Sequence, residues 1–226
     1  MDIQIKTQGL TKQYKMGTQT VEALKGVDLE IEKGTFTAIC GTSGSGKSTL
    51  LHMLGCLDKA TSGDVYIGDT KVTQTKDKKL AKIRRENIGF VFQKFCLIPE
   101  LTVTENIIVP VLLSGKRPDT AYIDELCDIL GLSDRKGHLP SELSGGQQQR
   151  CAIARALAND PQIVLCDEPT GNLDKKTGEE VISLLHEVNK KYYKTVVIVT
   201  HDESIASGAD RIIRIEDGAI VQAQYP

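Results

Sequence analysis

The chain has 226 residues and a formal net charge of −2, with 28 lysines and arginines against 30 aspartates and glutamates. This length suits one domain with a sizeable core and room for an inserted subdomain, and the near-neutral charge excludes a global attraction to nucleic acid or anionic lipid. No apolar run reaches the roughly 18 residues of a membrane helix, and the first six residues lack the apolar stretch of a signal peptide, so we expect neither feature.

Cysteine usage indicates a reducing compartment. The six cysteines are scattered, form no CxxC pair and lie in several cases within apolar segments, where a reduced thiol behaves as a small hydrophobic group. They are Cys40, Cys56, Cys96, Cys127, Cys151 and Cys166. None of the four histidines neighbours a cysteine, which argues against a structural metal site. We therefore expect a cytosolic protein with free thiols.

The first third of the chain is predicted to consist of strands and turns. Alternating apolar and polar residues at 3–6 and 27–31 predict strands, and a mostly apolar run at 35–40 predicts a buried strand. A helix can follow at 47–56, and residues 64–72 are typical of a small hairpin around Gly68 and Asp69.

The middle of the chain is predicted to be a mainly helical insert over about 94–160. Within it, residues 119–130 carry apolar side chains at i, i+3, i+4 and i+7, which predicts an amphipathic helix ended by Gly131. A second helix is predicted over 146–158, before Pro161.

Strands and helices alternate again after the insert. We predict strands at 162–166, 195–199 and 211–215, and a helix at 175–190. Near-continuous apolar strands separated by helices indicate a largely parallel sheet covered on both faces. The expected organisation is one α/β domain over 1–226, with its core and an antiparallel β-subdomain formed by 1–93 and 161–226.

A basic stretch at residues 71–85 could be taken for a nucleic-acid patch. It lacks interleaved aromatic residues, and it contains Asp77 and is followed by Glu86. A solvated helix face explains this pattern better, so we expect no nucleic-acid partner.

Residues 41–48 read Gly-Thr-Ser-Gly-Ser-Gly-Lys-Ser and match the pattern GxxxxGK[ST]. In such a loop the glycines let backbone N–H groups converge on phosphates, the lysine reaches the β and γ oxygens, and the last hydroxyl can bind Mg²⁺. Lys47 and Ser48 take these two roles. The strand expected before the loop and the helix expected after it provide the context that the motif requires.

An acidic pair follows the apolar run at 163–166. Asp167 is placed at the carboxyl end of a buried strand, where α/β sheets bind ligands and where an aspartate can hold Mg²⁺. Glu168 would then orient or deprotonate a water near the γ-phosphate. The alternative is an acidic pair that caps the next helix.

The segment Leu143-Ser144-Gly145-Gly146-Gln147 is a turn that opens a helix, a second place where bare N–H groups favour an anion. One nucleotide does not need two such sites within one chain. Two chains that face each other do, so we expect a homodimer in which the loop of one chain and the turn of the other enclose the same ATP.

These motifs, in this order and along nearly the whole chain, resemble those of ATP-binding cassette (ABC) ATPases of the P-loop class. The resemblance implies that Gln93 contacts Mg²⁺ and the attacking water, that His201 hydrogen-bonds the γ-phosphate, and that Asp174 belongs to the dimer-crossing D-loop. It also implies that Tyr14 stacks on adenine, although a tyrosine in an edge strand is ordinary packing as well.

The implied ATP-binding set is Tyr14, Gly41, Thr42, Ser43, Gly44, Ser45, Gly46, Lys47, Ser48 and Thr49. The implied catalytic set is Lys47, Gln93, Glu168 and His201, the metal set is Ser48, Gln93 and Asp167, and Ser144, Gly145, Gly146 and Gln147 would act on the partner's ATP.

A finer resemblance, carried by residues 88–93, 143–150 and 168–174, points to the branch of lipoprotein-releasing (LolD-like) and macrolide-exporter (MacB-like) ATPases. It implies a peripheral ATP hydrolase on the cytoplasmic face of the cell membrane, driving export or extraction of a lipoprotein, peptide or drug-like cargo. An integral membrane permease would dock near Phe95, Leu97, Ile98 and Leu101, for which core packing is the simpler explanation.

Two other classes of cassette compete with transport, and the first of them stays open from the sequence. Cell-division cassettes of the FtsE type regulate a cell-wall hydrolase without transport. Soluble cassettes of DNA repair and translation carry long insertions or a second cassette, which 226 residues do not accommodate. An iron–sulfur assembly ATPase would fit by size, but the stretch after Gln93 argues against it.

Overall fold

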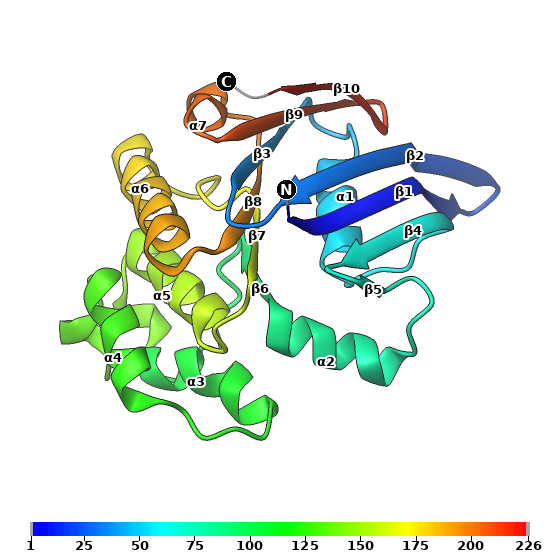
Figure 1. Ribbon diagram of the computed structural model, residues 1–226. Coiled ribbons are helices and arrows are strands. Elements are labelled where there is room, and N and C mark those ends of the chain that lie inside the picture. Colours follow the sequence, from blue (N-terminus) through cyan, green and yellow to red (C-terminus); the bar gives the residue numbers. More distant parts are fainter. Residues whose placement is uncertain (1, 225–226) are drawn as a thin grey trace. The chain divides into compact units, whose positions relative to one another are not determined.

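The computed structural model describes residues 2–224 (Figure 1). By its internal packing the chain divides into two compact units. The first unit comprises the chain up to Ala81 together with the segment from Lys194 onward, and the second comprises Lys82–Tyr193. Helix α2 (Asp77–Asn87) crosses the boundary in the sequence. Each unit is described by itself.

The first unit contains a four-stranded antiparallel sheet, as the sequence predicts. Its strands are β1 (Ile3–Met16), β2 (Gln19–Glu32), β4 (Ser62–Ile67) and β5 (Thr70–Lys71), in the order β2-β1-β4-β5. The alternating residues at 27–31 bury one face, since Val27, Leu29 and Ile31 are all buried while the residues between them are exposed. Strands β4 and β5 form the predicted hairpin.

The same unit contains three parallel strands in the order β9-β3-β8. They are β3 (Phe36–Cys40), β8 (Thr195–Thr200) and β9 (Arg211–Glu216), and β10 (Ala219–Gln224) pairs antiparallel with β9. Every residue of β3 and β8 is buried, as expected for parallel strands covered on both faces. Helix α1 (Lys47–Leu54) contacts β8, and α7 (Glu203–Ser207) contacts both β3 and β8.

The second unit is built around helix α5 (Gly145–Leu157). This helix packs against α3 (Val103–Leu113), α4 (Thr120–Ile129), α6 (Lys175–Tyr192) and strand β6 (Ile88–Phe92). Strand β6 pairs in parallel with β7 (Ile163–Asp167), and two short 3-10 turns, Ser133–Arg135 and Pro140–Glu142, precede α5. Five consecutive residues on α5 show why it is central, since Cys151, Ala152, Ile153 and Ala154 are fully buried and Arg155 is half-buried.

The ends of helix α4 in the second unit are set by a capping side chain and by a glycine. Asp119 caps α4 by accepting hydrogen bonds from the backbone N–H groups of Ala121 and Tyr122, and Gly131 beyond its end has φ +62°. The second unit is wider than the predicted insert at 94–160, because β6, β7 and α6 group with the insert's helices. The predicted domain boundaries therefore stay a prediction.

Two further expectations are confirmed. The part of the basic stretch at 77–85 lies on α2, where Ile83 is buried and the other residues are exposed or half-buried, so this part is a solvated helix face, whereas residues 71–76 lie in β5 and the turn after it. The six cysteines are free thiols, of which Cys96 is exposed and the rest are buried. Within residues 2–224, no helix is long and apolar enough to cross a membrane.

Candidate functional site

The loop between β3 and α1 has a backbone that requires glycine at two positions. Gly46 has φ +101°, and a Cβ there would lie 2.5 Å from the carbonyl oxygen of Ala23. At Gly41 a Cβ would lie 2.1 Å from the carbonyl oxygen of Ile215. Since real Cβ atoms do not approach backbone oxygens so closely, these glycines let the loop pass against its neighbours.

The loop is held by its own hydrogen bonds and presents polar groups suited to an anion. Lys47, which is 5% exposed, folds back so that its ammonium donates to the carbonyl oxygen of Thr42 at 2.6 Å. The buried hydroxyl of Ser45 has no hydrogen-bond partner within residues 2–224. Helix α1 begins at Lys47 with Gly46 as its N-cap and no capping side chain, so its first turn offers N–H groups to a phosphate.

Tyr14 is anchored at both its ring and its hydroxyl. The hydroxyl donates to Asp58 at 2.9 Å, and the ammonium of Lys12 lies 4.7 Å from the ring centroid while pairing with Asp58 at 2.8 Å. Burial and the hydrogen bond to Asp58 raise the pKa of Tyr14. Burial acts to raise the pKa of Asp58, but hydrogen bonds from Lys12, from the Lys59 N–H and from Tyr14 outweigh it and lower that pKa. Stacking of adenine on Tyr14 stays a prediction.

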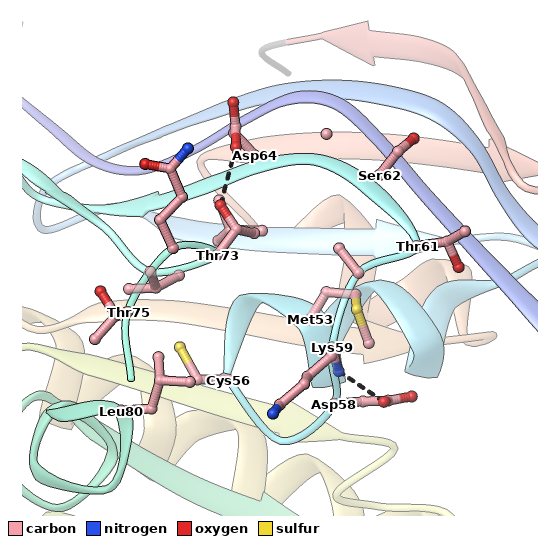
Figure 2. Close-up of a pocket in the computed structure, with 15 residues that line it drawn as sticks. Met53, Cys56, Asp58, Lys59, Thr61, Ser62, Asp64, Thr73, Thr75 and Leu80 are labelled. Atoms are coloured by element: carbon pink, nitrogen blue, oxygen red, sulfur yellow. Dashed lines mark hydrogen bonds between the residues drawn. The ribbon is translucent and has the colours of Figure 1, made fainter. Parts of the chain in front are cut away.

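A cavity of about 360 Å³ lies in the first unit (Figure 2). Its lining includes Met53, Cys56, Asp58, Thr61, Ser62, Asp64, Thr73, Thr75 and Leu80. The lining carboxylates have partners of their own, since Asp58 pairs with Lys12, and Asp64 pairs with Lys71 and accepts a hydrogen bond from Thr73. Residues 41–49 do not belong to the lining, so this cavity is not the phosphate loop's site.

In the second unit, β6 and β7 bring three predicted residues to one edge. Phe92 and Asp167 are opposite each other in the register of the two parallel strands, so Gln93 and Glu168 each follow a strand end at the same edge. Glu168 has φ +43°, a left-handed conformation that costs a non-glycine residue on the order of 1–3 kcal/mol and that occurs preferentially at functional sites. The N–H of Gly171 donates to the carbonyl oxygen of Glu168 at 3.0 Å and closes this turn.

Gln93 is tied to the segment after this turn. The side chain of Asn172 donates to the carbonyl oxygen of Gln93 at 2.9 Å, and the amide Nε2 of Gln93 lies 3.5 Å from Oδ1 of Asn172. A Cβ added to Gly171 would lie 2.6 Å from the same Nε2. The sequence analysis assigned Asp174 to the D-loop but missed this contact of Asn172, two residues earlier, for which no local pattern exists.

The Ser-Gly-Gly turn is less bare than the sequence suggests. Ser144 accepts a hydrogen bond from the N–H of Gln147 at 3.3 Å, and the side chain of Gln147 accepts one from the N–H of Ser144 at 2.9 Å. This capping box satisfies two N–H groups of the turn that we expected to face an anion, those of Ser144 and Gln147. Gly146 lies against α6, where an added Cβ would be 2.4 Å from Cγ2 of Thr177.

The remaining predicted residues sit at helix starts. Asp174 is the N-cap of α6 and accepts from the N–H of Thr177 at 3.1 Å. The hydroxyl and the N–H of Thr177 lower the pKa of Asp174. His201 is exposed and follows β8 directly, one residue before Asp202, the N-cap of α7. These positions agree with the predicted order of motifs, and their roles toward a nucleotide stay predictions.

The segment proposed for docking is largely pinned in place. Asn106 is fully buried and donates to the carbonyl oxygens of Ile98 and Leu101, while accepting from the N–H of Ile98 at 2.8 Å. Arg155 of α5 donates to the carbonyl oxygen of Phe95 at 2.8 Å. Phe95, Leu97 and Leu101 are half-buried, whereas the side chain of Ile98 is 38% exposed.

An ABC-type ATPase is defined by three features that this α/β fold carries in chain order. They are a phosphate loop after a buried strand, a Ser-Gly-Gly helix start and an acidic strand end. The chain belongs to the ABC transporter family, whose model matches residues 24–171. It is therefore a cassette that binds and hydrolyses ATP, of the LolD/MacB type.

Relatives in several organisms support this assignment. The ABC transporter ATP-binding protein MJ0796 of Methanocaldococcus jannaschii is 50% identical, with 96% of this chain and 94% of that protein covered. The LolD ATP-binding protein of Legionella pneumophila is 48% identical, with 97% of each chain covered. The MacB protein of Shigella flexneri is 46% identical, and the match covers 96% of this chain but 34% of MacB, an ATP-binding/permease protein.

The structure also superposes closely on solved cassettes. A dimeric structure of MJ0796 in a post-hydrolysis state, bound to ADP and Pi, matches with a TM-score of 0.90 and 47% identity over 98% of each chain. A second dimeric structure of MJ0796 gives a TM-score of 0.90 as well. These matches confirm the predicted fold class.

Proposed function

We propose that the chain is the energy-coupling subunit of an exporter or extractor of lipoprotein, peptide or drug-like cargo, bound peripherally to the cytoplasmic face of the membrane. The observation that carries this proposal is the match to LolD, a lipoprotein-releasing ATP-binding protein, over 97% of both chains. The MacB match, in which a permease is part of the same protein, supports a membrane partner. Both relatives favour transport over the regulatory role of the cell-division cassettes.

In this proposal the phosphate loop binds ATP and Glu168 acts as the general base toward the attacking water. The left-handed backbone of Glu168 supports the assignment, because strain of this kind is retained where the position of a side chain matters. Lys47 would neutralise the phosphate charge, and His201, exposed at the end of β8, would hydrogen-bond the γ-phosphate. Tyr14 would hold the adenine.

The proposed metal set fits Mg²⁺. This ion prefers oxygen ligands and usually takes one or two from protein while phosphates and water supply the others. The hydroxyl of Ser48 and the carboxylate of Asp167 are such donors. Gln93 turns its Nε2 toward Asn172, which leaves its Oε1 as the acceptor atom for a cation. When bound, Mg²⁺ would neutralise charge on the β- and γ-phosphates.

Two chains are proposed to share each ATP, with Ser144, Gly145, Gly146 and Gln147 of one chain and Asp174 facing the nucleotide of the other. The dimeric MJ0796 structure with ADP and Pi, at 47% identity, supports this arrangement. The capping box at Ser144 means that the partner's phosphate would meet an ordered helix start rather than a flexible loop.

The first test replaces Glu168 by Gln. Loss of a general base lowers a rate by about 10²- to 10⁴-fold, whereas ATP binding should survive, so the variant should accumulate an ATP-bound dimer on size exclusion. Asp2→Asn, a neutralisation of an exposed carboxylate near the N-terminus, is the control. Turnover near that of the wild type would remove Glu168 from the mechanism.

The second test addresses the shared site by mixing chains. Ser144→Asp keeps a side chain that can cap α5 but places a negative charge where the partner's phosphate is proposed to bind. Neither this variant nor Lys47→Ala should turn over alone, and the mixture should recover activity, because one composite site per heterodimer is then intact. Absence of recovery, with heterodimers detected, would contradict the sharing of sites.

A further inference from the structure

Gln149 lies inside the second unit on helix α5, five residues after Ser144. Its side chain is fully buried. The amide Nε2 donates to the carbonyl oxygen of Pro169 at 2.6 Å and lies 3.4 Å from the carbonyl oxygen of Phe92. One side-chain amide therefore joins the helix of the Ser-Gly-Gly turn to the ends of both β6 and β7.

The two carbonyl groups flank the residues to which we assign chemistry. Pro169 directly follows Glu168, and Phe92 directly precedes Gln93. The backbone of Glu168 is in the left-handed region, with φ +43°, so contacts around the turn must hold it there. The hydrogen bond to the next carbonyl oxygen, at 2.6 Å, is one such contact.

The amide at this position has both a favourable and an unfavourable effect on stability, and the favourable one is the hydrogen bonding of its Nε2 to the carbonyl oxygens of Pro169 and Phe92. Its other polar atom, Oε1, is buried and makes no hydrogen bond within residues 2–224. A buried acceptor without a partner is unfavourable, and an apolar side chain of similar length would remove that cost. We therefore infer that the amide matters because its donor group fixes the positions of the carbonyl groups that it contacts.

We propose that Gln149 is a positioning residue for ATP hydrolysis. It fixes the turn that carries Glu168, and the strand end before Gln93, to helix α5. This helix begins within the signature, the name we use for the segment Leu143-Ser144-Gly145-Gly146-Gln147. A shift of α5, when its N-terminus engages the partner's nucleotide, is thereby passed to Glu168 through a single side chain. This inference rests on the proposed role of Glu168 as general base.

The test compares two side-chain amides with matching chemistry. Gln149→Met removes the donor at similar length. The control is Asn159→Leu, because Asn159 also donates to a proline carbonyl, that of Pro110 at 2.9 Å, and also has a buried side-chain oxygen without a partner in the described part of the chain. Within residues 2–224 the amide of Asn159 donates to Pro110 and Ser114, and not to Pro169 or Phe92.

For Gln149→Met we expect kcat to fall on the order of 10- to 100-fold, the range typical of losing an outer partner of a functional group. The KM for ATP should stay within about twofold of the wild-type value, because the phosphate loop is untouched. Asn159→Leu should leave kcat unchanged. In a Glu168→Gln background the Met substitution should lower the residual rate by less than about twofold, since both changes act through one group.

The outcomes separate this inference from the proposed function. Normal turnover of Glu168→Gln alone would overturn the role of Glu168 and this inference with it. If Glu168→Gln is impaired but Gln149→Met is not, or if the two effects multiply, the positioning role alone is wrong. Failure of both Gln149→Met and Gln149→Leu to fold would show that the amide serves stability and would also overturn the proposal.

Discussion

The side chain of Asn172 contacts both the backbone and the side chain of Gln93. Its Nδ2 donates to the carbonyl oxygen of Gln93 at 2.9 Å, and its Oδ1 lies 3.5 Å from Nε2 of Gln93. These residues are 79 positions apart in the chain. The contact links the segment after β6 to the segment after Glu168, so a movement of either one alters the other. Gln93, which is proposed to contact Mg²⁺ and the attacking water, is thus joined to the loop proposed to cross the dimer.

The first prediction removes this link. Asn172→Ala should lower ATP turnover several-fold, because Gln93 loses a hydrogen bond worth about 1 kcal/mol and its amide becomes free to rotate. Nucleotide affinity, measured by titration with a fluorescent ATP analogue, should not change. Asn172→Asp is the matched variant, since it keeps the size but cannot donate to the Gln93 carbonyl oxygen. Wild-type turnover in both variants would show that the contact has no part in hydrolysis.

The second prediction separates two adjacent glycines of the signature. Gly146→Ala should destabilise the protein by about 1–3 kcal/mol, the usual cost of overpacking, because its Cβ would lie 2.4 Å from Cγ2 of Thr177. Gly145→Ala should be tolerated, since the nearest atom to its Cβ, on Leu173, is 3.4 Å away. Thermal unfolding measures both. Equal melting temperatures for the two variants would contradict this packing argument.

The same result limits how signature variants are interpreted. A substitution at Gly146 changes the packing of α5 against α6 within one chain, whereas Ser144 is exposed and lies at the helix start. Loss of activity at Gly146 therefore does not by itself indicate an effect on the partner's ATP. Ser144 is the position at which the shared site can be tested.

The third prediction concerns Tyr14. Tyr14→Ala should weaken ATP binding by about 1–3 kcal/mol, the usual contribution of a base stacked on an aromatic ring. If only the ring face mattered for adenine binding, Tyr14→Phe would have no effect. The hydroxyl, however, donates to Asp58 and helps to hold the ring. We therefore expect a smaller loss for Tyr14→Phe, of about 1 kcal/mol. An ATP dissociation constant that is unchanged in Tyr14→Ala would place the adenine elsewhere.

Local sequence patterns predicted the elements that depend on local physics. Apolar runs located β3, β7 and β8, and periodicity located α4 to within a residue. The contacts of Gln149, Asn172 and Tyr14 could not be predicted in this way, because each depends on a partner at least 20 positions away, brought near by packing. The pattern S-x-x-Q at Ser144 did contain the capping box, a signal that the sequence analysis passed over.

The last prediction concerns the membrane partner. Of the large apolar residues at 95–101, Ile98 is the exposed one, at 38%, and its backbone is hydrogen-bonded to Asn106. An exposed apolar side chain on a fixed segment suits an interface with an amphipathic helix of a permease. Ile98→Glu should detach the ATPase from membranes while leaving basal hydrolysis and melting temperature near the wild-type values, because Ile98 is exposed and is not one of the buried core residues. Val221→Glu on β10, where the valine is 55% exposed, is the control that should stay bound. Co-purification with membranes that survives Ile98→Glu, or that Val221→Glu abolishes equally, would show that the permease binds another surface.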